Sequence, residues 1–323
     1  MWIVTQPNTQ CYPSCDLVAK PYKTPVAINC SNDNMKSGFV SIFGRPNAGK
    51  STLLNALLQE KLAIVSPKVQ TTRHRIKGIV TTDEYQIIFS DTPGIIEPQY
   101  KLQEKMMNAV KQALEDADVA VLLIDINENW EDVNQLFESL RLQVPAIVAI
   151  NKVDEADENK KQEAFRFFNA KKYCTEIVAI SALQGYNISE LVRLVVKYLP
   201  EGMPFFDSEE MTDLPTRFFV AELIREKIFY LFHEEIPYHT TVIVNEFKEK
   251  ATITKIVADI IVQRESQKGI LLGQGGKMIR QLGTEARKDI EQFLGRKVFL
   301  ELFVKVRPKW RDNELMLREY GYQ

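Results

Sequence analysis

Eight consecutive residues constrain the fold of this chain more than any other feature of its sequence. They run from Gly44 to Ser51, read GRPNAGKS, and fit the phosphate-binding pattern G-x-x-x-x-G-K-[S/T]. An apolar run at Phe39–Phe43 precedes them, and a helical pattern at Ser51–Leu58 follows. The amides of such a loop and the N-terminus of its helix together bind phosphate. The sequence therefore predicts a strand, loop and helix unit that holds a phosphorylated ligand.

From residue 35 to residue 200 the chain alternates short apolar runs with helical patterns. Runs that are apolar on both faces suit strands buried inside a parallel sheet. They lie at Phe39–Phe43, Tyr85–Phe89, Val119–Ile124, Ala146–Ile150 and Ile177–Ile180. The helical patterns between them lie at Leu102–Leu114, Val133–Leu140 and Ile188–Leu199. This alternation predicts an α/β domain with a mostly parallel sheet.

A stop signal and a change of pattern follow this domain. Pro200 and Pro204 flank a glycine and precede an acidic stretch, so residues 201–215 are expected to form a linker. Residues 216–323 then show a new order of helix, strand, strand, helix, Gly-rich turn, helix and strand. The clearest of these elements lie at Arg217–Phe232, Thr240–Phe247, Thr252–Val262 and Lys297–Lys305, with a helix that ends near Leu294. We expect a second, smaller α+β domain with a C-terminal tail.

The composition indicates a globular chain that does not cross a membrane. Hydrophobic residues make up 45% of the 323 residues and charged residues 26%, which excludes a disordered tail protein and a collagen-like repeat. No stretch approaches the roughly 18 to 20 uncharged apolar residues of a membrane helix. The four cysteines include no CxxC pair, so neither a zinc site nor a disulfide framework is predicted. Residues 1–34 are polar and aperiodic, and we expect an extension that is disordered or that precedes a true start at Met35.

Three further motifs follow the phosphate-binding loop, each at the end of an apolar run. The first is Asp91-Thr92-Pro93-Gly94, whose carboxylate can hold the shell of a Mg²⁺ ion and whose last amide can meet a γ-phosphate. The second is Asn151-Lys152-Val153-Asp154, whose last carboxylate can accept hydrogen bonds from N1 and N2 of guanine. Adenine offers no such pair, and a buried acceptor disfavours ligands that leave it unpaired. The third is Ser181-Ala182, where a backbone amide can donate to guanine O6.

In this order and behind such a loop, the motifs resemble those of translation-factor-type GTPases. That class places an effector threonine where Thr71 and Thr72 stand, so one of these hydroxyls is expected to complete the Mg²⁺ shell, with Thr72 favoured. The predicted Mg²⁺ ligands are Ser51, Thr72 and Asp91, and the residues predicted to act in hydrolysis are Lys50, Thr72 and Gly94. The predicted GTP/GDP site comprises Gly44, Arg45, Pro46, Asn47, Ala48, Gly49, Lys50, Ser51, Thr52, Asp91, Thr92, Pro93, Gly94, Ile95, Asn151, Lys152, Val153, Asp154, Ser181 and Ala182.

The residue after the DTPG motif bears on how hydrolysis is assisted. Many Ras-like switches place a glutamine there to orient the attacking water. This chain has Ile95, which can neither donate nor accept a hydrogen bond. Asn47 is the candidate helper, because G domains with Asn at this position often use it to hold a K⁺ ion against the phosphates. The alternative is that Asn47 only shapes the loop.

The second domain carries a signature of nucleic-acid binding. A G-x-x-G element stands between two helical patterns, and its predicted RNA-binding residues are Gly273, Gln274, Gly275, Gly276, Lys277 and Arg280. The surrounding order of elements is that of a KH domain of the second type, and such a loop lets two backbones approach closely. Between Arg264 and Arg311 there are twelve basic and five acidic residues, an excess of +7 against a net charge of -2 for the chain. Such asymmetry indicates a polyanionic partner.

One G domain followed by a KH domain resembles the bacterial Era family. The match includes GRPNAGKSTLLN, QTTRHR at Gln70–Arg75, RFFVAELIREKIF at Arg217–Phe229 and VFLELFVKV at Val298–Val306. The resemblance implies a GTPase that binds the 3′ end of small-subunit ribosomal RNA during assembly of the 30S subunit, with a role that couples assembly to the cell cycle. It also implies a cytoplasmic protein with peripheral contact to the membrane, and we expect a monomer.

Two other functions use the same G domain. One is a GTP-dependent enzyme of tRNA modification or membrane traffic, and the other is a G domain with a protein-interaction module. A filter-binding assay with single-stranded RNA distinguishes these two functions from the hypothesis of an RNA-binding GTPase. Strong affinity that falls steeply with salt favours RNA binding, and no affinity favours the others.

Overall fold

The structure is a computed structural model, and it describes residues 35–66 and 68–322. These residues belong to one compact unit. The expected extension of residues 1–34, with three of the four cysteines and the question of the true start, lies outside the described residues.

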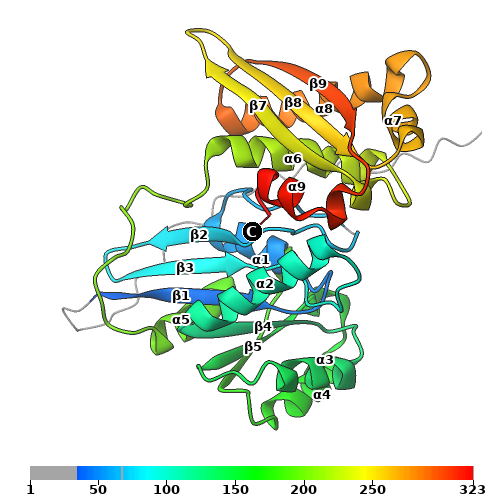
Figure 1. The fold of residues 1–323 in the computed structure, drawn as a ribbon. Helices are drawn as coiled ribbons and strands as arrows, with labels where there is room; N and C mark the ends of the chain where they lie inside the picture. Colours follow the sequence, from blue (N-terminus) through cyan, green and yellow to red (C-terminus); the bar gives the residue numbers. More distant parts are fainter. Residues whose placement is uncertain (1–34, 67, 323) are drawn as a thin grey trace, which may run out of the picture. The chain divides into compact units, whose positions relative to one another are not determined.

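Six strands form the sheet of the first domain, in the order β2-β3-β1-β4-β5-β6 (Figure 1). Their bounds are β1 Lys36–Phe43, β2 Ile76–Thr81, β3 Tyr85–Asp91, β4 Val119–Asp125, β5 Ala146–Asn151 and β6 Glu176–Ala179. Five strands run parallel, and β2 pairs with β3 in the antiparallel sense. The prediction of a mostly parallel sheet is confirmed. The sequence pattern did not reveal β2, because this short edge strand is only partly buried.

Helices cover both faces of this sheet. They are α1 Lys50–Leu58, α2 Lys101–Asp116, α3 Trp130–Ser139, α4 Glu158–Asn169 and α5 Ile188–Tyr198, with the single 3-10 turn Val153–Glu155. Apolar side chains of α1 and α5 pack on one face, and those of α2, α3 and α4 pack on the other. The sequence pattern missed α4, because Ala164 and Phe168 are its only buried residues.

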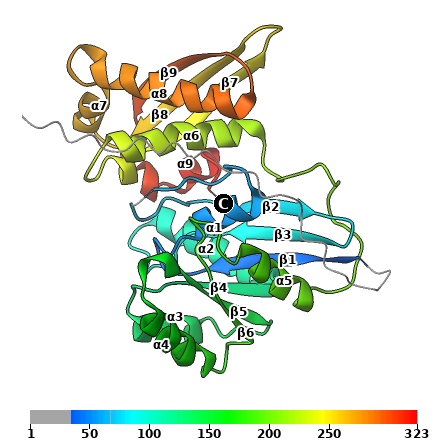
Figure 2. The ribbon, with the colours of Figure 1, turned by 180° about the vertical axis from the view of Figure 1, so that it is seen from behind.

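The second domain packs three helices on a three-stranded sheet (Figure 2). Its elements are α6 Thr216–Leu231, β7 Thr241–Glu249, β8 Thr254–Val262, α7 Glu265–Leu272, α8 Lys277–Leu294, β9 Val298–Val306 and α9 Glu314–Glu319, with the 3-10 turns Pro237–His239, Gln274–Gly276 and Trp310–Asp312. Strands β7 and β8 pair antiparallel and β8 and β9 pair parallel, so β8 is central. This is the order of elements that the sequence predicts for residues 216–323.

The C-terminal segment joins the two domains through an apolar cluster. Trp310, Leu317 and Tyr322 are buried there against Leu102 and Met106 of α2. The tail expected from the sequence is therefore part of the core between the domains.

Residues 201–215, predicted to be a linker, are bound along the sheet of the first domain. The buried side chain of Gln86 on β3 accepts hydrogen bonds from the amides of Phe205 and Phe206, at 2.7 and 3.0 Å, and donates to the Phe206 carbonyl at 2.7 Å. The Ser37 hydroxyl donates to the Met203 carbonyl at 2.6 Å. The connection is thus a strap held by side chains of the sheet. The amino-acid pattern of this segment shows only the turn and charge signals of a linker, because its partners lie more than a hundred residues away.

Gln86→Ala should release this strap. The substitution removes three hydrogen bonds to the strap backbone, and we expect the free energy of unfolding to fall by about 2 kcal/mol in urea titrations. Limited proteolysis should also cut faster between residues 202 and 213. Gln143→Ala is the control, because that exposed amide bonds only to the nearby Arg141 carbonyl. Unchanged stability and cleavage in Gln86→Ala would contradict this description of the strap.

Candidate nucleotide-binding site

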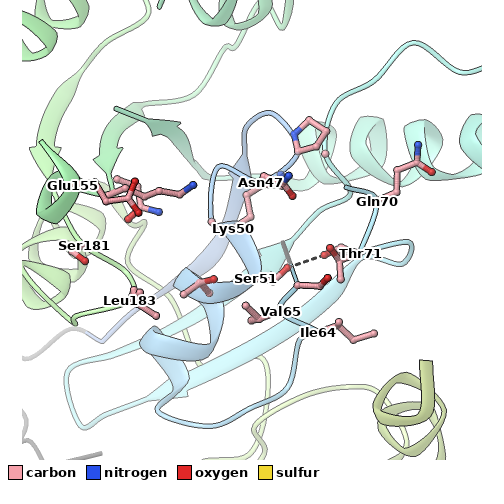
Figure 3. Close-up of a pocket in the computed structure, with 18 of the residues that line it drawn as sticks. Asn47, Lys50, Ser51, Ile64, Val65, Gln70, Thr71, Glu155, Ser181 and Leu183 are labelled. Atoms are coloured by element: carbon pink, nitrogen blue, oxygen red, sulfur yellow. Dashed lines mark hydrogen bonds between the residues drawn. The ribbon is translucent and has the colours of Figure 1, made fainter. Parts of the chain in front are cut away.

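A cavity of about 390 Å³ lies where the loops after β1, β3, β5 and β6 meet (Figure 3). Ligand sites of α/β sheets occur at this edge, beyond the carboxyl ends of the strands. The predicted residues that line it are Pro46, Asn47, Gly49, Lys50, Ser51, Thr52, Thr72, Gly94, Asn151, Lys152, Asp154 and Ser181. The structure therefore brings together members of every motif found in the sequence.

The phosphate-binding loop needs its glycines for space. A Cβ on Gly44 would lie 2.4 Å from the Leu123 carbonyl oxygen, and one on Gly49 would lie 2.3 Å from the Asn151 amide nitrogen. Gly49 also has a φ of 99°, which side chains rarely adopt, and no side chain caps the helix that follows it. The first amides of α1 are thus left for an anionic ligand.

Lys50 is held inside this loop. Its ammonium group donates to the carbonyls of Gly44 and Arg45, at 3.1 and 2.8 Å. Burial lowers the pKa of Lys50 to about 8, although the carboxylates of Asp91 and Glu128 act in the opposite direction. A buried ammonium group with carbonyl partners is poised to exchange them for phosphate oxygens, which carry more charge.

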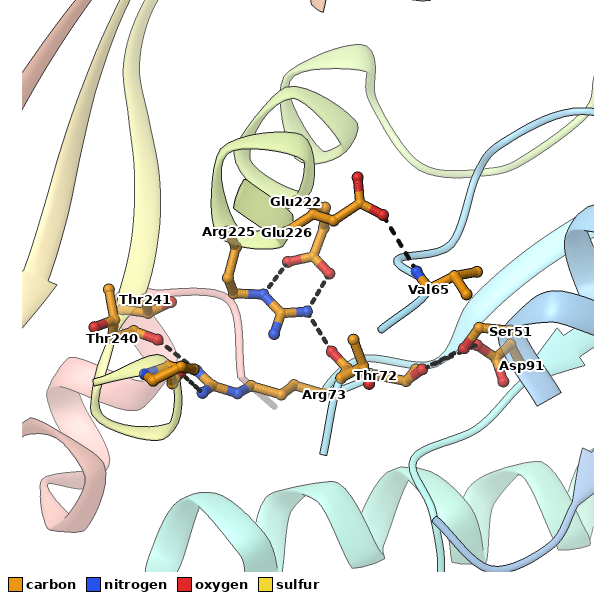
Figure 4. A network of polar contacts seen from close by, with 12 residues as sticks. Ser51, Val65, Thr72, Arg73, Asp91, Glu222, Arg225, Glu226, Thr240 and Thr241 are labelled. Carbon is orange, nitrogen blue, oxygen red and sulfur yellow. Dashed lines mark hydrogen bonds and ion pairs between the residues drawn. The ribbon is translucent and has the colours of Figure 1, made fainter. Parts of the chain in front are cut away.

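The side-chain oxygens of Ser51, Thr72 and Asp91 meet behind the phosphate-binding loop (Figure 4). The Ser51 hydroxyl lies 2.8 Å from the Thr72 hydroxyl and donates to Asp91 Oδ2 at 2.7 Å, and the Thr72 hydroxyl lies 3.1 Å from the same oxygen. Burial raises the pKa of Asp91, while Lys50 and the two hydroxyls oppose this shift. The second carboxylate oxygen of Asp91 is buried without a hydrogen-bond partner. A hard cation such as Mg²⁺ prefers oxygen ligands of this kind, so the residues fit the predicted metal.

The structure also distinguishes the two threonines that the sequence left open. The Thr71 hydroxyl donates to the Lys68 carbonyl at 2.9 Å, within its own loop. Only Thr72, of the two, points its hydroxyl toward Ser51 and Asp91. The geometry therefore agrees with Thr72 as the predicted ligand.

Asn151 connects three loops around the cavity. Its amide nitrogen donates to the Ala48 carbonyl at 2.8 Å, and its amide oxygen accepts from the Ala182 backbone at 2.9 Å. Asn151 is almost fully buried, so both bonds form in a site with little water. This side chain fixes the phosphate-binding loop relative to the two loops expected to read guanine. Because the Ala182 amide is used in this contact, its predicted bond to guanine O6 stays a prediction.

Several predicted residues support the cavity from behind and do not line it. Thr92 directs its hydroxyl to the Ile42 carbonyl at 2.7 Å, and Val153 and Ile95 pack in the core below. Arg45 forms an ion pair with Asp132 at 3.5 Å. The predicted residues outside the lining are Gly44, Arg45, Ala48, Asp91, Thr92, Pro93, Ile95, Val153 and Ala182. Their predicted roles toward the nucleotide are untested by this geometry.

The lining also contains Thr71, the alternative candidate, and residues that the sequence did not reveal, namely Ile64, Val65, Ser66, Gln70, Glu155 and Leu183. Most of them belong to the loop between α1 and β2. That loop has no regular pattern and carries only the Thr71-Thr72 signal, so nothing in the sequence identified its other members. Their position depends on contacts with the second domain, which are described below.

The G-x-x-G element of the second domain has the backbone that the motif requires. Gly273, Gly275 and Gly276 have φ angles of 67°, 59° and 76°. A Cβ on Gly275 would meet nothing within 4 Å, so its surface is open. Lys277 and Arg280 begin α8 directly after the element and are exposed. The structure thus places all six predicted RNA-binding residues on one loop and the first turn of one helix.

The sheet topology and the cavity define a P-loop GTPase domain joined to a KH domain. Comparison with known families agrees, because the family of 50S ribosome-binding GTPases matches residues 39–152 and the KH domain family matches residues 235–311. GTPase Era of Caldanaerobacter subterraneus is 43% identical over 291 residues, which cover 89% of this chain and 98% of that protein. GTPase Era of Thermoanaerobacter pseudethanolicus is 44% identical over 291 residues, which cover 89% and 96%. The chain belongs to the Era family of GTPases.

Two solved structures are similar to this chain. A crystal structure of Era in complex with MgGDPNP and nucleotides 1506–1542 of 16S ribosomal RNA is 44% identical, with a TM-score of 0.85, and the match covers 89% of this chain and 99% of the other. A crystal structure of Aquifex aeolicus Era Y63A bound to GDP.AlF4⁻ is 43% identical, with a TM-score of 0.86 and the same coverage.

In the part of the chain that the structure describes, no helix is long and apolar enough to cross a membrane.

Asp154→Asn should shift the base preference from guanine toward xanthine. Asp154 lines the cavity, and an amide there can donate to xanthine O2 where the carboxylate accepted from guanine N2. Competition binding of GTP against XTP measures the change. Asp157→Asn is a matched control, because Asp157 caps α4 by accepting from the Lys160 amide and asparagine caps equally well. Unchanged selectivity in Asp154→Asn would contradict the assignment of this loop to the base.

Proposed function

We propose that this GTPase binds the 3′ end of small-subunit ribosomal RNA and acts as a GTP-dependent switch in assembly of the 30S subunit. The proposal rests on one observation above all. A cavity with the Ser51, Thr72 and Asp91 oxygens and an exposed, basic G-x-x-G loop occur in the same compact unit. The Era relative bound to 16S ribosomal RNA supports the choice of RNA.

We propose the following roles at the nucleotide. The amides of the phosphate-binding loop and Lys50 bind the phosphates, and Asp154 selects guanine. Ser51, Thr72 and Asp91 would hold Mg²⁺, which neutralises charge between the β- and γ-phosphates when it is bound. Ile95 packs in the apolar core, so it supplies no hydrogen bond to the attacking water. Hydrolysis without further help should therefore be slow.

Asn47 is our candidate for a second cation site. Asn47 lines the cavity, and its backbone has a left-handed φ of 67°. A K⁺ ion held there would stand where an arginine finger stabilises the transition state in other GTPases.

Cytoplasmic residence, peripheral contact with the membrane, a monomeric state and a link to the cell cycle rest on the family resemblance alone, and we retain them as proposals.

GTP turnover should rise several-fold when K⁺ replaces Na⁺ at equal ionic strength. Asn47→Gly should abolish the difference, because glycine keeps the positive φ and removes the side chain. Phosphate release measured in the two salts gives the answer. Equal rates in K⁺ and Na⁺ for the unmutated protein would mean that the backbone, RNA or a partner assists hydrolysis instead.

Gly275→Asp should weaken binding of single-stranded RNA while GTP binding stays intact. The side chain and its negative charge would block the approach of an RNA backbone to an open surface. Filter binding with an RNA of the 16S 3′-terminal sequence measures the loss, which we expect to exceed tenfold. Gly295→Asp is the matched control. Gly295 has a φ of 63° and the same open surroundings, but it ends α8, about 27 Å from the G-x-x-G loop.

Equal loss of RNA affinity in both glycine variants would point to the backbone strain that they share. Loss of RNA and GTP binding together in Gly275→Asp would mean that the two sites are not separable.

A further inference from the structure

The loop between α1 and β2 is described for residues 59–66 and 68–75, and both of these parts contact the second domain; we call this loop the effector loop. Lys61 forms an ion pair with Glu226 at 2.6 Å, although the Glu226 side chain is only 1% exposed. The other oxygen of Glu226 accepts from the Val65 amide at 3.3 Å. Tyr230 donates its hydroxyl to the Val65 carbonyl at 2.7 Å. One face of α6 therefore binds the first half of the effector loop.

The second half of the loop is held by Arg225 of α6 (Figure 4). This guanidinium is 1% exposed and forms two hydrogen bonds with Glu222, at 2.7 and 2.5 Å. It also donates to the Thr71 carbonyl. A buried ion pair is costly unless its donors are satisfied, and the bond to Thr71 supplies one further acceptor, although Nη1 of Arg225 is buried without a hydrogen-bond partner. The bond therefore contributes to the stability of α6 as well as of the loop.

Arg73 reaches in the other direction, from the effector loop into the second domain. Its guanidinium is buried and donates to the carbonyls of Thr240, Pro237 and Tyr238, at 2.7, 2.8 and 3.2 Å. These carbonyls lie at the turn before β7. The planar fork of arginine matches several acceptors at once, whereas a lysine ammonium group would not span them.

Thr72 stands between these two anchors. The carbonyl of Thr71 is fixed by Arg225, and the side chain of Arg73 is fixed by the second domain, so the backbone on both sides of Thr72 is held. Thr72 alone turns inward, to Ser51 and Asp91. The stacked rings of His74 and Tyr322, 4.4 Å apart, add a further contact just beyond. The threonine hydroxyl is thus held in its place by contacts of the protein itself.

In many GTPases the γ-phosphate and Mg²⁺ order this loop, and the loop is released after hydrolysis. Ordering a residue costs roughly 1–2 kcal/mol in backbone entropy, so a loop that is already ordered binds its ligand with less loss. Here the contacts to the second domain supply that order. The structure therefore offers a physical route from the second domain to the affinity for GTP.

We propose that Arg73 and Arg225 are positioning residues through which the KH domain holds Thr72 ready for the metal-bound γ-phosphate. The proposal rests on the proposed function in one respect, that Thr72 contacts this metal. Loss of either arginine should weaken binding of the triphosphate much more than binding of GDP, because only the triphosphate form uses the effector threonine.

The test compares the affinities for Mg²⁺ with GDPNP and for GDP. Arg73→Ala should raise the Kd for GDPNP about tenfold and leave the Kd for GDP within about twofold. Thr72→Ala should have a similar effect, and the double variant should be no weaker than Thr72→Ala alone, because Arg73 acts through Thr72. Arg73→Lys should lie between Arg73→Ala and the unmutated protein.

The second domain offers an independent variant. Glu222→Gln together with Arg225→Gln removes the donor to Thr71 without leaving a buried charge unpaired, and it should give the same pattern. Lys77→Ala is the control, since Lys77 pairs with Asp213 of the strap and should change neither affinity. Unchanged GDPNP affinity in Arg73→Ala, or full additivity with Thr72→Ala, would overturn the proposal.

Hydrogen exchange of the nucleotide-free protein separates this proposal from the proposed function. Amides of residues 68–75 should be protected in the unmutated protein and should exchange at least about tenfold faster in Arg73→Ala. If the unmutated protein bound no guanine nucleotide, the proposed function would fail, and the exchange result would still decide whether Arg73 holds the loop. Equal exchange in the two proteins would show that it does not.

Discussion

The parallel arrangement of β1, β3, β5 and β6 is the constraint on which the nucleotide site depends. Each of these strands ends at the same edge of the sheet, so four loops that are far apart in sequence meet there. Asn151 then joins three of the loops with two buried hydrogen bonds, to Ala48 and Ala182. Because one side chain fixes their spacing, the phosphate and base parts of the cavity form a single site.

Buried charge is the second theme of this structure. Lys50 and Asp91 are both buried. Desolvation lowers the pKa of Lys50 and raises the pKa of Asp91, so it favours the neutral form of each side chain. Neither arrangement is favourable in an apolar core, but both suit a site that exchanges protein partners for phosphate and a cation. Arg73 and Arg225 show the same principle between the domains, where each buried guanidinium donates to carbonyl or carboxylate oxygens of the other domain or of its own helix. The strap bound to Gln86 and the tail packed on α2 support this arrangement.

Much of the fold could be predicted because the relevant signals are local. The apolar runs predicted five strands of the first sheet. The motifs at the ends of these strands predicted that a ligand site lies at that edge of the sheet. In the first domain the sequence pattern missed β2 and α4, because β2 is a half-buried edge strand and α4 buries only Ala164 and Phe168. Residues 201–215 were predicted only as a linker, and their binding to Gln86 could not be predicted because it depends on a residue in a distant strand.

The sequence by itself determined the chemistry of this protein: a phosphate-binding loop, carboxylates at strand ends, and a basic G-x-x-G element after a break. These are patterns of neighbouring residues, and their physical requirements are satisfied within a few residues of backbone. Only the tertiary structure shows which of Thr71 and Thr72 directs its hydroxyl toward Asp91, and only it reveals Arg73 as a buried anchor in the second domain. In the sequence Arg73 is one basic residue among several. Its role arises from three carbonyls more than 160 residues away, which only folding brings within reach.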